Sequence, residues 1–409
     1  MDDVNPEAAG MSAQRLARVD RHLLERFIEG GKIHGALTAV YRRGHLAHFS
    51  PLGMADAERS VPVRDDTIFR IYSMTKPITS VALMMLYERG MLQLSDPVSR
   101  YIPAFEKLRV YKSGVYPRYE TERPAREMQV HHLLTHTSGL TYGFVGRTNV
   151  DSGYRKAKLD GADSRFDHTL PEAMEKLAEL PLEFSPGERW NYSVATDVCG
   201  YLVEVISGRP FPEFLREEIF EPLGMYDTAF SVSDDRLPRF AACYERTAHK
   251  ETRLQDDPAT SPYREEPKFH SGGGGLVSTA HDYLRFARML LGKGELDGVR
   301  MVSRKTLELM TRNHLPGGVE LSAIATGAYS ESRYDGTGFG LGFSVSLDPA
   351  IALISGTPGE FAWGGAASTA FWVDPAEDMV VVFLTQLRPS TTFNFRGQLK
   401  QIIYGAIID

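Results

Sequence analysis

Strand-like segments stand near both ends of this 409-residue chain, and helical segments stand between them. Near the N-terminus, two apolar-rich runs within residues 36–50 flank an Arg-Arg-Gly turn and predict a β-hairpin. Near the C-terminus, residues 339–347, 367–373 and 379–385 have strand-like composition. Because strands from both ends can share one layer only if the chain folds back on itself, this order predicts an antiparallel sheet flanked by terminal helices.

The middle of the chain, from Pro77 to about Gly224, is predicted to be mostly helical. A polar crossing loop is expected over residues 246–270. Periodic apolar residues predict helices at 81–89, 130–137, 171–180, 196–207 and 212–220, and after the loop at 279–291, 303–312 and 395–408.

The length of the chain bears on its domain organisation, because one hydrophobic core usually stops growing near about 250–300 residues. We therefore expect two lobes. Residues 1–80 and 265–409 would form a discontinuous α/β domain that holds the sheet, and residues 81–264 a mainly helical domain. An active-site cleft is expected between the two domains, which is a common place for one.

Charge and hydropathy exclude several classes of partner. The chain has 53 acidic and 46 basic side chains, and it lacks the long basic run that binds nucleic acid or anionic lipid. Its longest apolar runs, 81–86 and 379–384, are far shorter than the roughly 20 residues that span a bilayer. The first 27 residues do not have the pattern of a secretory signal. These features predict a cytoplasmic protein without nucleic-acid or membrane partners.

The two cysteines, Cys199 and Cys243, are too few for a disulfide framework, and neither stands near a paired metal ligand. We expect both thiols to be buried and inert.

A Ser-x-x-Lys tetrad, formed by Ser73 and Lys76, is the first candidate for chemistry. Pro77 has no N–H and is tolerated only in the first turn of a helix, and the residues from Val81 onward are helical in pattern. Ser73 is therefore expected at or very near a helix N-terminus, with the Lys76 amine on the same face three residues later. From this motif alone, an N-capping serine followed by a solvated lysine is an equal alternative.

Two further segments are candidates. Tyr192 follows a Ser-Pro-Gly turn and directly precedes a predicted helix, where a core tyrosine is the simpler interpretation. Trp363, Gly364 and Gly365 stand at the start of a predicted strand, where glycines let a substrate approach the backbone closely. A glycine bulge beside a packing tryptophan would explain the same pattern.

Taken together and in order, these motifs resemble those of the family VIII carboxylesterases, which are serine hydrolases built on the class C β-lactamase fold. Residues 132–140, which read His-Leu-Leu-Thr-His-Thr-Ser-Gly-Leu, and residues 271–286 resemble other recurring segments of that superfamily. The resemblance covers most of the chain and is much more specific than any single motif. It implies an α+β fold with an antiparallel sheet, flanking helices and an inserted, mainly helical lobe.

The resemblance also implies roles for individual residues. Ser73 would attack an ester carbonyl, Lys76 and Tyr192 would share one mobile proton as the base, and Tyr192 would protonate the leaving alkoxide. The N–H groups of Ser73 and Ala366 would form the oxyanion hole, and residues 363–365 would bind substrate. Neither a cofactor nor a metal is expected.

The chain departs from the β-lactamase pattern at two places. β-Lactamases and penicillin-binding proteins carry Tyr-x-Asn and Lys-Thr-Gly where this chain has Tyr-Ser-Val at 192–194 and Trp-Gly-Gly at 363–365. Since the missing lysine helps hold a substrate carboxylate, its replacement by an apolar ring favours neutral short-chain esters and weak or no β-lactam hydrolysis. The Gly-x-Ser-x-Gly elbow of α/β-hydrolases is absent from the sequence.

Two rival functions stay open. A polyketide acyltransferase of the same scaffold would pass the acyl group to an alcohol, and a catalytically silent penicillin-binding-like protein would only bind ligands. The natural substrate, the acyl-chain length, the stereopreference and the oligomeric state are not predicted.

Three other patterns are not expected to carry chemistry. His131, His132 and His136 lack the glutamate of a His-Glu-x-x-His zinc site, and the glycines at 272–275 lack the Gly-Lys-Ser/Thr of a phosphate-binding loop. The segment His-Ser-Gly at 270–272 resembles a variant of the lysine-containing strand motif, but it precedes a helix.

Overall fold

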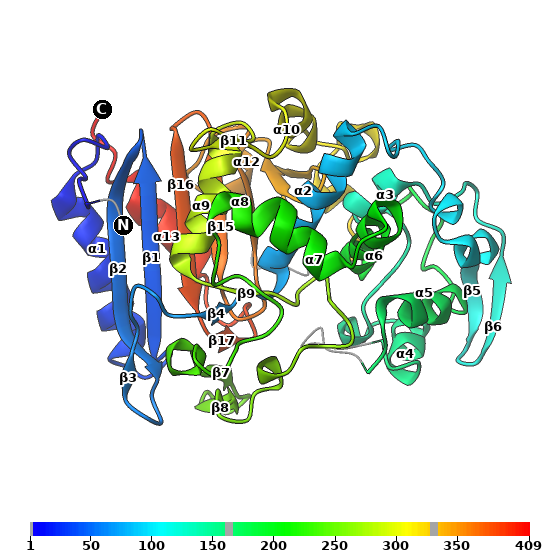
Figure 1. The fold of residues 1–409 in the computed structure, drawn as a ribbon, viewed down its shortest axis with the longest axis horizontal. Coiled ribbons are helices and arrows are strands. Elements are labelled where there is room, and N and C mark those ends of the chain that lie inside the picture. The colour runs from blue at the N-terminus through cyan, green and yellow to red at the C-terminus, as the bar shows by residue number, and fades with distance from the viewer. Residues whose placement is uncertain (1–2, 160–166, 328–333) are drawn as a thin grey trace.

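The computed structural model describes residues 3–159, 167–327 and 334–409, and its main feature is an eight-stranded sheet (Figure 1). The strand order is β12-β13-β14-β15-β16-β1-β2-β3, and every neighbouring pair is antiparallel. The strands are β1 (Gly35–Arg42), β2 (His45–Asp56), β3 (Val61–Pro62), β12 (Thr337–Phe339), β13 (Ser344–Ser346), β14 (Phe361–Gly364), β15 (Ala370–Asp374) and β16 (Met379–Thr385). The expected antiparallel sheet is therefore confirmed.

The pairing of β1 with β16 joins the two ends of the chain, from Ala36 opposite Thr385 to Arg42 opposite Met379. Every residue of both strands is buried. Side chains alternate between the two faces, since Leu37 and Ala39 belong to one hydrophobic cluster and Ala36 and Val40 to another. Such a strand pair needs a layer of helices on each face.

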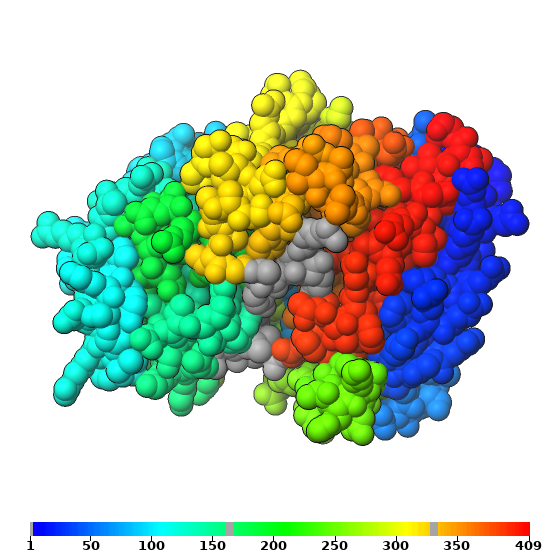
Figure 2. Space-filling model, turned by 180° about the vertical axis from the view of Figure 1, so that it is seen from behind, coloured from blue at the N-terminus to red at the C-terminus, as the bar shows by residue number. Residues whose placement is uncertain are grey.

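Helices from both ends of the chain cover one face of the sheet, and a helix from the middle covers the other. Helix α1 (Ala13–Leu23) packs against α13 (Phe395–Tyr404), so the first and last helices lie side by side (Figure 2). Helix α9 (Ala280–Leu291) crosses the opposite face over β16 and β15 (Figure 1). Its first turn is capped by Thr279, whose hydroxyl accepts a hydrogen bond from the N–H of Asp282.

The segment between β3 and α9 is mainly helical, and most of its helices lie to one side of the sheet (Figure 1). Its helices are α2 (Thr75–Glu88), α3 (Val130–Leu134), α4 (Asn149–Lys156), α5 (Leu170–Ala178), α6 (Ala195–Ser207), α7 (Phe211–Leu215) and α8 (Glu221–Leu223). Helix α2 is buried from Thr75 to Leu86 and packs against α6. The division into domains at residues 80/81 and 264/265 stays a prediction.

Several elements differ from the sequence expectation. A hairpin of β5 (Val110–Val115) and β6 (Arg118–Glu122) interrupts the helical region, and the crossing loop contains β8 (Thr252–Asp256), which pairs with β7 (Cys243–Arg246). These strands were missed because most of their solvent-facing residues are polar or charged, Val115 being an exception. Strand β17 (Leu387–Arg388) completes that small sheet by pairing in parallel with β7.

The single strand expected over residues 339–347 is instead the end of β12, a turn and β13. Gly342 in that turn has a φ of 95°, and a Cβ there would lie 2.2 Å from the Ser80 Oγ on α2. The glycine therefore lets the turn pack directly on the helix. The remaining elements are β4 (Phe69–Arg70), β9 (Val277–Ser278), β10 (Glu295–Leu296), β11 (Val299–Arg300), α10 (Arg304–Met310), α11 (Leu321–Ile324) and α12 (Pro349–Ala352).

None of the helices within the described residues combines the length and the apolar character needed to cross a membrane.

A fully buried arginine, Arg70, ties β4 to the segment that follows the helical region. Its Nε lies 2.7 Å from the carboxylate of Asp256, and its Nη1 donates to the carbonyl of Ala241 at 2.6 Å. The guanidinium also stacks over Phe240, with the Cζ 3.9 Å from the ring centroid. Arg70 stands three residues before Ser73, so these contacts fix the backbone that enters the Ser-x-x-Lys tetrad.

We predict that Arg70→Met lowers the free energy of unfolding by about 3–5 kcal/mol, because it leaves the carboxylate of Asp256, whose side chain is 11% exposed, without its charged partner. The matched control is Arg216→Met. Arg216 forms ion pairs with two carboxylates, those of Glu217 and Glu221, but its side chain is 53% exposed and both carboxylates are exposed as well. Its loss should cost at most about 1 kcal/mol. Urea denaturation measures both values, and equal losses would contradict the assignment.

Candidate active site

Ser73 lies in the 3-10 turn Tyr72–Met74, directly before α2. Tyr72 has a φ of 43°, a left-handed conformation that is uncommon for a bulky residue. The neighbouring backbone and the burial of Tyr72, which is 3% exposed, hold this conformation. Ser73 itself is half-buried, so its hydroxyl stands at the N-terminus of a buried helix and reaches a cavity.

Lys76 is 2% exposed, and its amino group contacts the serine. The Nζ donates to the Ser73 Oγ at 3.1 Å and to the carbonyl oxygen of Gly273 at 2.7 Å. Burial lowers the pKa of Lys76 from its ordinary 10.5 to about 7, while the carboxylate of Asp197 acts in the opposite direction. A lysine with this pKa can both accept and release a proton near neutral pH.

Tyr192 comes from the segment before α6, and its hydroxyl donates to the Ser73 Oγ at 2.6 Å. The Lys76 Nζ lies 4.4 Å from the centroid of the Tyr192 ring. The structure thus brings together the three residues that the sequence singled out, from positions 73, 76 and 192. A proton can pass among their three polar atoms without a large movement of any side chain.

Aromatic rings fix the orientation of Tyr192. His136, Tyr142 and Trp363 lie with their ring centroids 5.0, 5.3 and 5.6 Å from that of Tyr192. Burial and the nearby Lys76 lower the pKa of His136 well below its usual value, so this ring is neutral at pH 7. His136 contacts the Ser193 hydroxyl at 3.2 Å and serves to hold the tyrosine segment.

A cavity of about 310 Å³ opens beside Ser73. Its walls come both from the helical region and from segments that follow strands of the sheet, so the site lies where these two parts meet. The lining residues are Tyr72, Ser73, Tyr142, Phe144, Tyr192, Gly273, Gly274, Ala366, Arg388, Pro389, Ser390 and Thr391.

None of the residues of the Trp-Gly-Gly segment is among those that line this cavity, and their expected contact with substrate stays a prediction. Trp363 packs between Tyr192 and Phe339, and Gly364 lies against Arg396. A Cβ on Gly365 would lie 2.3 Å from the carbonyl oxygen of Ile71. The segment therefore supports the tyrosine and the backbone before Ser73, and it brings the next residue, Ala366, to the cavity wall.

The sequence did not single out several residues at this site. Arg388 lines the cavity, with its Cζ 5.3 Å from the centroid of the Tyr72 ring, and Gly273 supplies the carbonyl group that receives Lys76. The family-like segment 271–286 contains Gly273, but a backbone acceptor has no signature of its own. Arg388 stands in a polar stretch, and no motif or spacing in that stretch indicates a position near residue 73.

The histidines near this site have other partners. His132 accepts a hydrogen bond from the N–H of Gln129 at 3.0 Å, and His131 contacts His314 at 3.3 Å. Burial lowers the pKa of both His131 and His132 to about 4. Over the described residues, no group of three or more His, Cys, Asp or Glu side chains is arranged to hold a metal ion.

Both thiols, Cys199 and Cys243, are buried, and burial raises their pKa values above the ordinary range.

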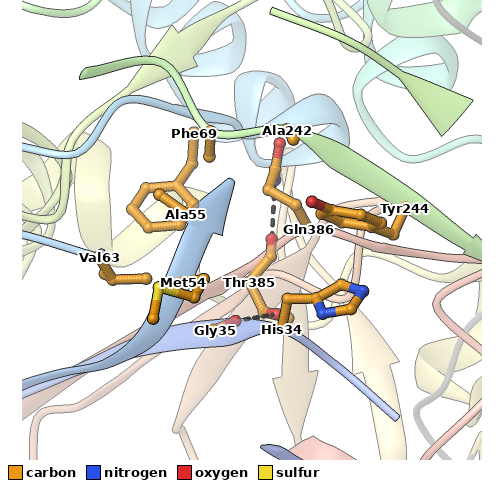
Figure 3. Close-up of a pocket in the computed structure, with 11 residues that line it drawn as sticks. His34, Gly35, Met54, Ala55, Val63, Phe69, Ala242, Tyr244, Thr385 and Gln386 are labelled. Atoms are coloured by element: carbon orange, nitrogen blue, oxygen red, sulfur yellow. Dashed lines mark hydrogen bonds between the residues drawn. The ribbon is translucent and has the colours of Figure 1, made fainter. Parts of the chain in front are cut away.

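A second, smaller hollow lies beside β1, β2 and the end of β16 (Figure 3). Its volume is about 10 Å³, which is room for about one water molecule. Thr385 and Gln386 line it and are hydrogen-bonded to the neighbouring backbone, the Thr385 hydroxyl to the carbonyl of Gly35 at 2.7 Å. This hollow is too small for a substrate.

The sequence is similar to two known proteins over most of its length. Rv1367c of Mycobacterium tuberculosis strain H37Rv is 37% identical over 364 residues, which cover 88% of each chain. Esterase EstB of Burkholderia gladioli is 33% identical over 400 residues, which cover 93% of this chain and 91% of EstB.

The fold has a close counterpart among solved structures. EstCE1, described as a hydrolase with promiscuous acyltransferase activity, superposes with a TM-score of 0.79 at 27% identity, over 96% of this chain and 99% of EstCE1. The expected class C β-lactamase-like α+β fold is thereby confirmed.

The model of the family described as Beta-lactamase matches residues 21–403. This match includes Ser73, Lys76 and Tyr192, and it extends from the first helix to the last. The chain therefore belongs to the beta-lactamase family and resembles the family VIII esterases within it.

Proposed function

We propose that this protein is a serine esterase that hydrolyses short-chain carboxylic esters through an acyl-enzyme on Ser73. One observation carries the proposal: the Ser73 Oγ lies within hydrogen-bond distance of both the Lys76 Nζ and the Tyr192 hydroxyl, at the wall of a cavity. A serine hydroxyl is a weak nucleophile until a neighbouring base accepts its proton. The similarity to esterase EstB supports the reaction class.

In the first half of the reaction, Ser73 Oγ bonds to the ester carbonyl carbon and its proton passes to the Lys76–Tyr192 pair. The N–H groups of Ser73 and Ala366 receive the oxyanion. The bond between the carbonyl carbon and the alcohol oxygen then breaks, and Tyr192 donates a proton to that oxygen. In the second half, water attacks the acyl group, gives its proton to the pair, and releases Ser73 with its hydroxyl restored.

The proposed substrates are neutral esters. The family's carboxylate-binding lysine is replaced by Trp363, which packs on Tyr192 with its ring and carries no charge. Tyr72, Tyr142 and Phe144 add aromatic surface to the cavity wall. Such surface favours apolar acyl or alcohol groups over a β-lactam carboxylate.

Acyl transfer to an alcohol is the second candidate, favoured by the structural similarity to EstCE1, a hydrolase described with promiscuous acyltransferase activity. Both reactions share the acyl-enzyme and differ only in the acceptor. Product analysis with added alcohols separates them, because a transferase makes new ester at the expense of free acid.

We predict that Ser73→Ala abolishes turnover of a p-nitrophenyl ester chain-length series, with a loss of several orders of magnitude in kcat, because the variant has no nucleophile. The variant should keep the wild-type urea midpoint. A fluorophosphonate probe should label wild-type Ser73, as located by mass spectrometry. Labelling at another serine would contradict the assignment, and no labelling at all would favour a silent, ligand-binding protein.

We predict that Lys76→Ala and Tyr192→Phe each lose most of the esterase activity and that their losses do not add, because the two residues act as one base. The double variant should be scarcely slower than the poorer single variant. Steady-state kcat/KM values for the four proteins test this prediction. Near-native activity of Tyr192→Phe would rule out the shared-proton mechanism.

We predict that kcat/KM for a p-nitrophenyl butyrate-type ester exceeds that for cephalosporins by orders of magnitude, because Val194 and Trp363 stand where the β-lactamase motifs have the asparagine and the lysine that hold the β-lactam. Parallel assays of both substrates on the wild type, with Ser73→Ala as background, provide the comparison. Equal turnover of the two substrates would overturn the substrate class and leave the Ser73 mechanism standing.

A further inference from the structure

The position of the Lys76 amino group depends on a loop that is remote in sequence. Besides the Ser73 Oγ, the Nζ donates to the carbonyl oxygen of Gly273, in the segment just before β9. This second bond, at 2.7 Å, is the shorter of the two. A shift of the Gly273 carbonyl would therefore move the amine away from the serine, and whatever fixes this loop also fixes the base.

Asp197, in the first turn of α6, fixes the loop. Its Oδ1 accepts a hydrogen bond from the Ser271 hydroxyl at 2.5 Å and one from the N–H of Gly273 at 2.9 Å. The residue is 3% exposed, so these bonds replace the water that a carboxylate would otherwise bind. A Cβ on Gly273 would lie 2.7 Å from the Asp197 Oδ2, so only glycine lets the loop approach the carboxylate this closely.

The geometry links Asp197 to both members of the base. Asp197 accepts a hydrogen bond from the N–H of Gly273, and Lys76 donates one to the carbonyl oxygen of the same residue. The N–H and the carbonyl group are attached to the same Cα. Asp197 also stands five residues after Tyr192, and its own N–H donates to the carbonyl of Val194 at 2.9 Å. One short segment thus carries Tyr192 and the anchor for Lys76.

We propose that Asp197 is a positioning residue for catalysis, which holds the Ser271–Gly273 loop so that Lys76 stays within reach of Ser73 and which supplies the buried negative charge that balances the lysine. This inference rests on the proposed esterase function. Asp197 would touch neither the substrate nor the Ser73 Oγ.

The charged and titratable groups around Lys76 support the proposal that Asp197 supplies the negative charge that balances the lysine. Tyr192 and Tyr142 present aromatic rings to the amine, with centroids 4.4 and 5.4 Å from the Nζ. His136 is kept neutral by burial, and burial raises the pKa of Cys199, next to Asp197, so that its thiol is uncharged. Among the described residues around the amine, Asp197 is the carboxylate that favours the charged lysine. Burial raises the pKa of Asp197, whereas the Ser271 hydroxyl, Lys76 and the Gly273 N–H favour its ionised form.

The test compares Asp197→Asn, which keeps the shape and removes the charge, with Asp197→Ala, which removes both. Asp282→Asn is the matched control. Asp282 is also 3% exposed, stands in the first turn of α9, and accepts hydrogen bonds from the N–H of Asp227 at 2.8 Å and the Thr228 hydroxyl at 2.9 Å. It anchors a loop in the same way, but over the described part of the chain none of its hydrogen bonds or ion pairs is to Ser73, Lys76 or Tyr192.

The readout is the pH dependence of kcat/KM for a p-nitrophenyl ester and of the fluorophosphonate labelling rate at Ser73. Without the carboxylate, the lysine loses its proton more easily, so the acid limb of both profiles should move to lower pH in Asp197→Asn, by about one pH unit. In Asp197→Ala, kcat should fall about 100-fold with little change in KM, because the base is displaced. Asp282→Asn should leave the acid limb at its wild-type position.

The inference would be overturned if the acid limb of Asp197→Asn coincided with that of the wild type. It would also be overturned if Asp282→Asn moved the acid limb by the same amount as Asp197→Asn. If Asp197→Ala does not fold, the isosteric variant still decides the question. A wild type that is labelled at Ser73 but hydrolyses no ester would refute the proposed function alone, since the labelling profiles still test Asp197. A wild type that is not labelled would overturn both.

Discussion

The antiparallel pairing of β1 with β16 is the constraint on which the rest of this structure depends. It buries two complete strands from opposite ends of the chain in the middle of one sheet. Each face of such a pair must be covered, and the chain covers one with its first and last helices and the other with α9. The long segment between the strands must therefore leave the sheet and return to it. The residues that line the Ser73 cavity come from the helical region of this segment and from the connections that follow β14 and β16.

A buried lysine is the second feature that organises the site. Transferring an ammonium group from water to a protein interior is unfavourable, so burial shifts the balance toward the neutral amine. In this site burial lowers the pKa of Lys76 to about 7, and the carboxylate of Asp197 acts in the opposite direction. The lysine can then cycle between its two forms during one turnover, which neither a solvated lysine nor a fully desolvated one could do near neutral pH.

The sequence was sufficient to predict features that depend on local spacing or on composition. The helical spacing between Ser73 and Lys76 is local, and the proline after them locates the helix start. Tyr192 could be added only through the family resemblance, because no local rule joins it to a serine 119 positions away. The long buried strand β16 was predicted because its apolar run is nearly continuous, a pattern that also marks a strand buried on both faces.

Features that depend on long-range packing were not predictable in the same way. The carbonyl of Gly273 and the guanidinium of Arg388 reach the site through tertiary structure alone. The β5–β6 hairpin lies partly in solvent, so its sequence lacks an apolar signal. The contact of Trp363 with substrate stays a prediction that rests on its motif position, whereas the packing of its ring against Tyr192 and Phe339 was not predicted. A motif fixes the position of the backbone, whereas the direction of a large side chain is set by the neighbours that fill the space around it.

The residues beneath the Ser73 cavity, which we call its floor, are buried, whereas those at its entrance, which we call its rim, are exposed. This difference affects which substitutions the protein can accept. Lys76 and Tyr192 are almost completely buried, at 2% and 4% exposure, and each is fixed by several neighbours. Phe144, Pro389 and Thr391, by comparison, are exposed on connecting segments. Substitutions at the rim can reshape the entrance without disturbing the packing beneath it. Selection could therefore change the preferred acyl group or acceptor through the rim alone, while the buried floor preserves the same proton-transfer chemistry.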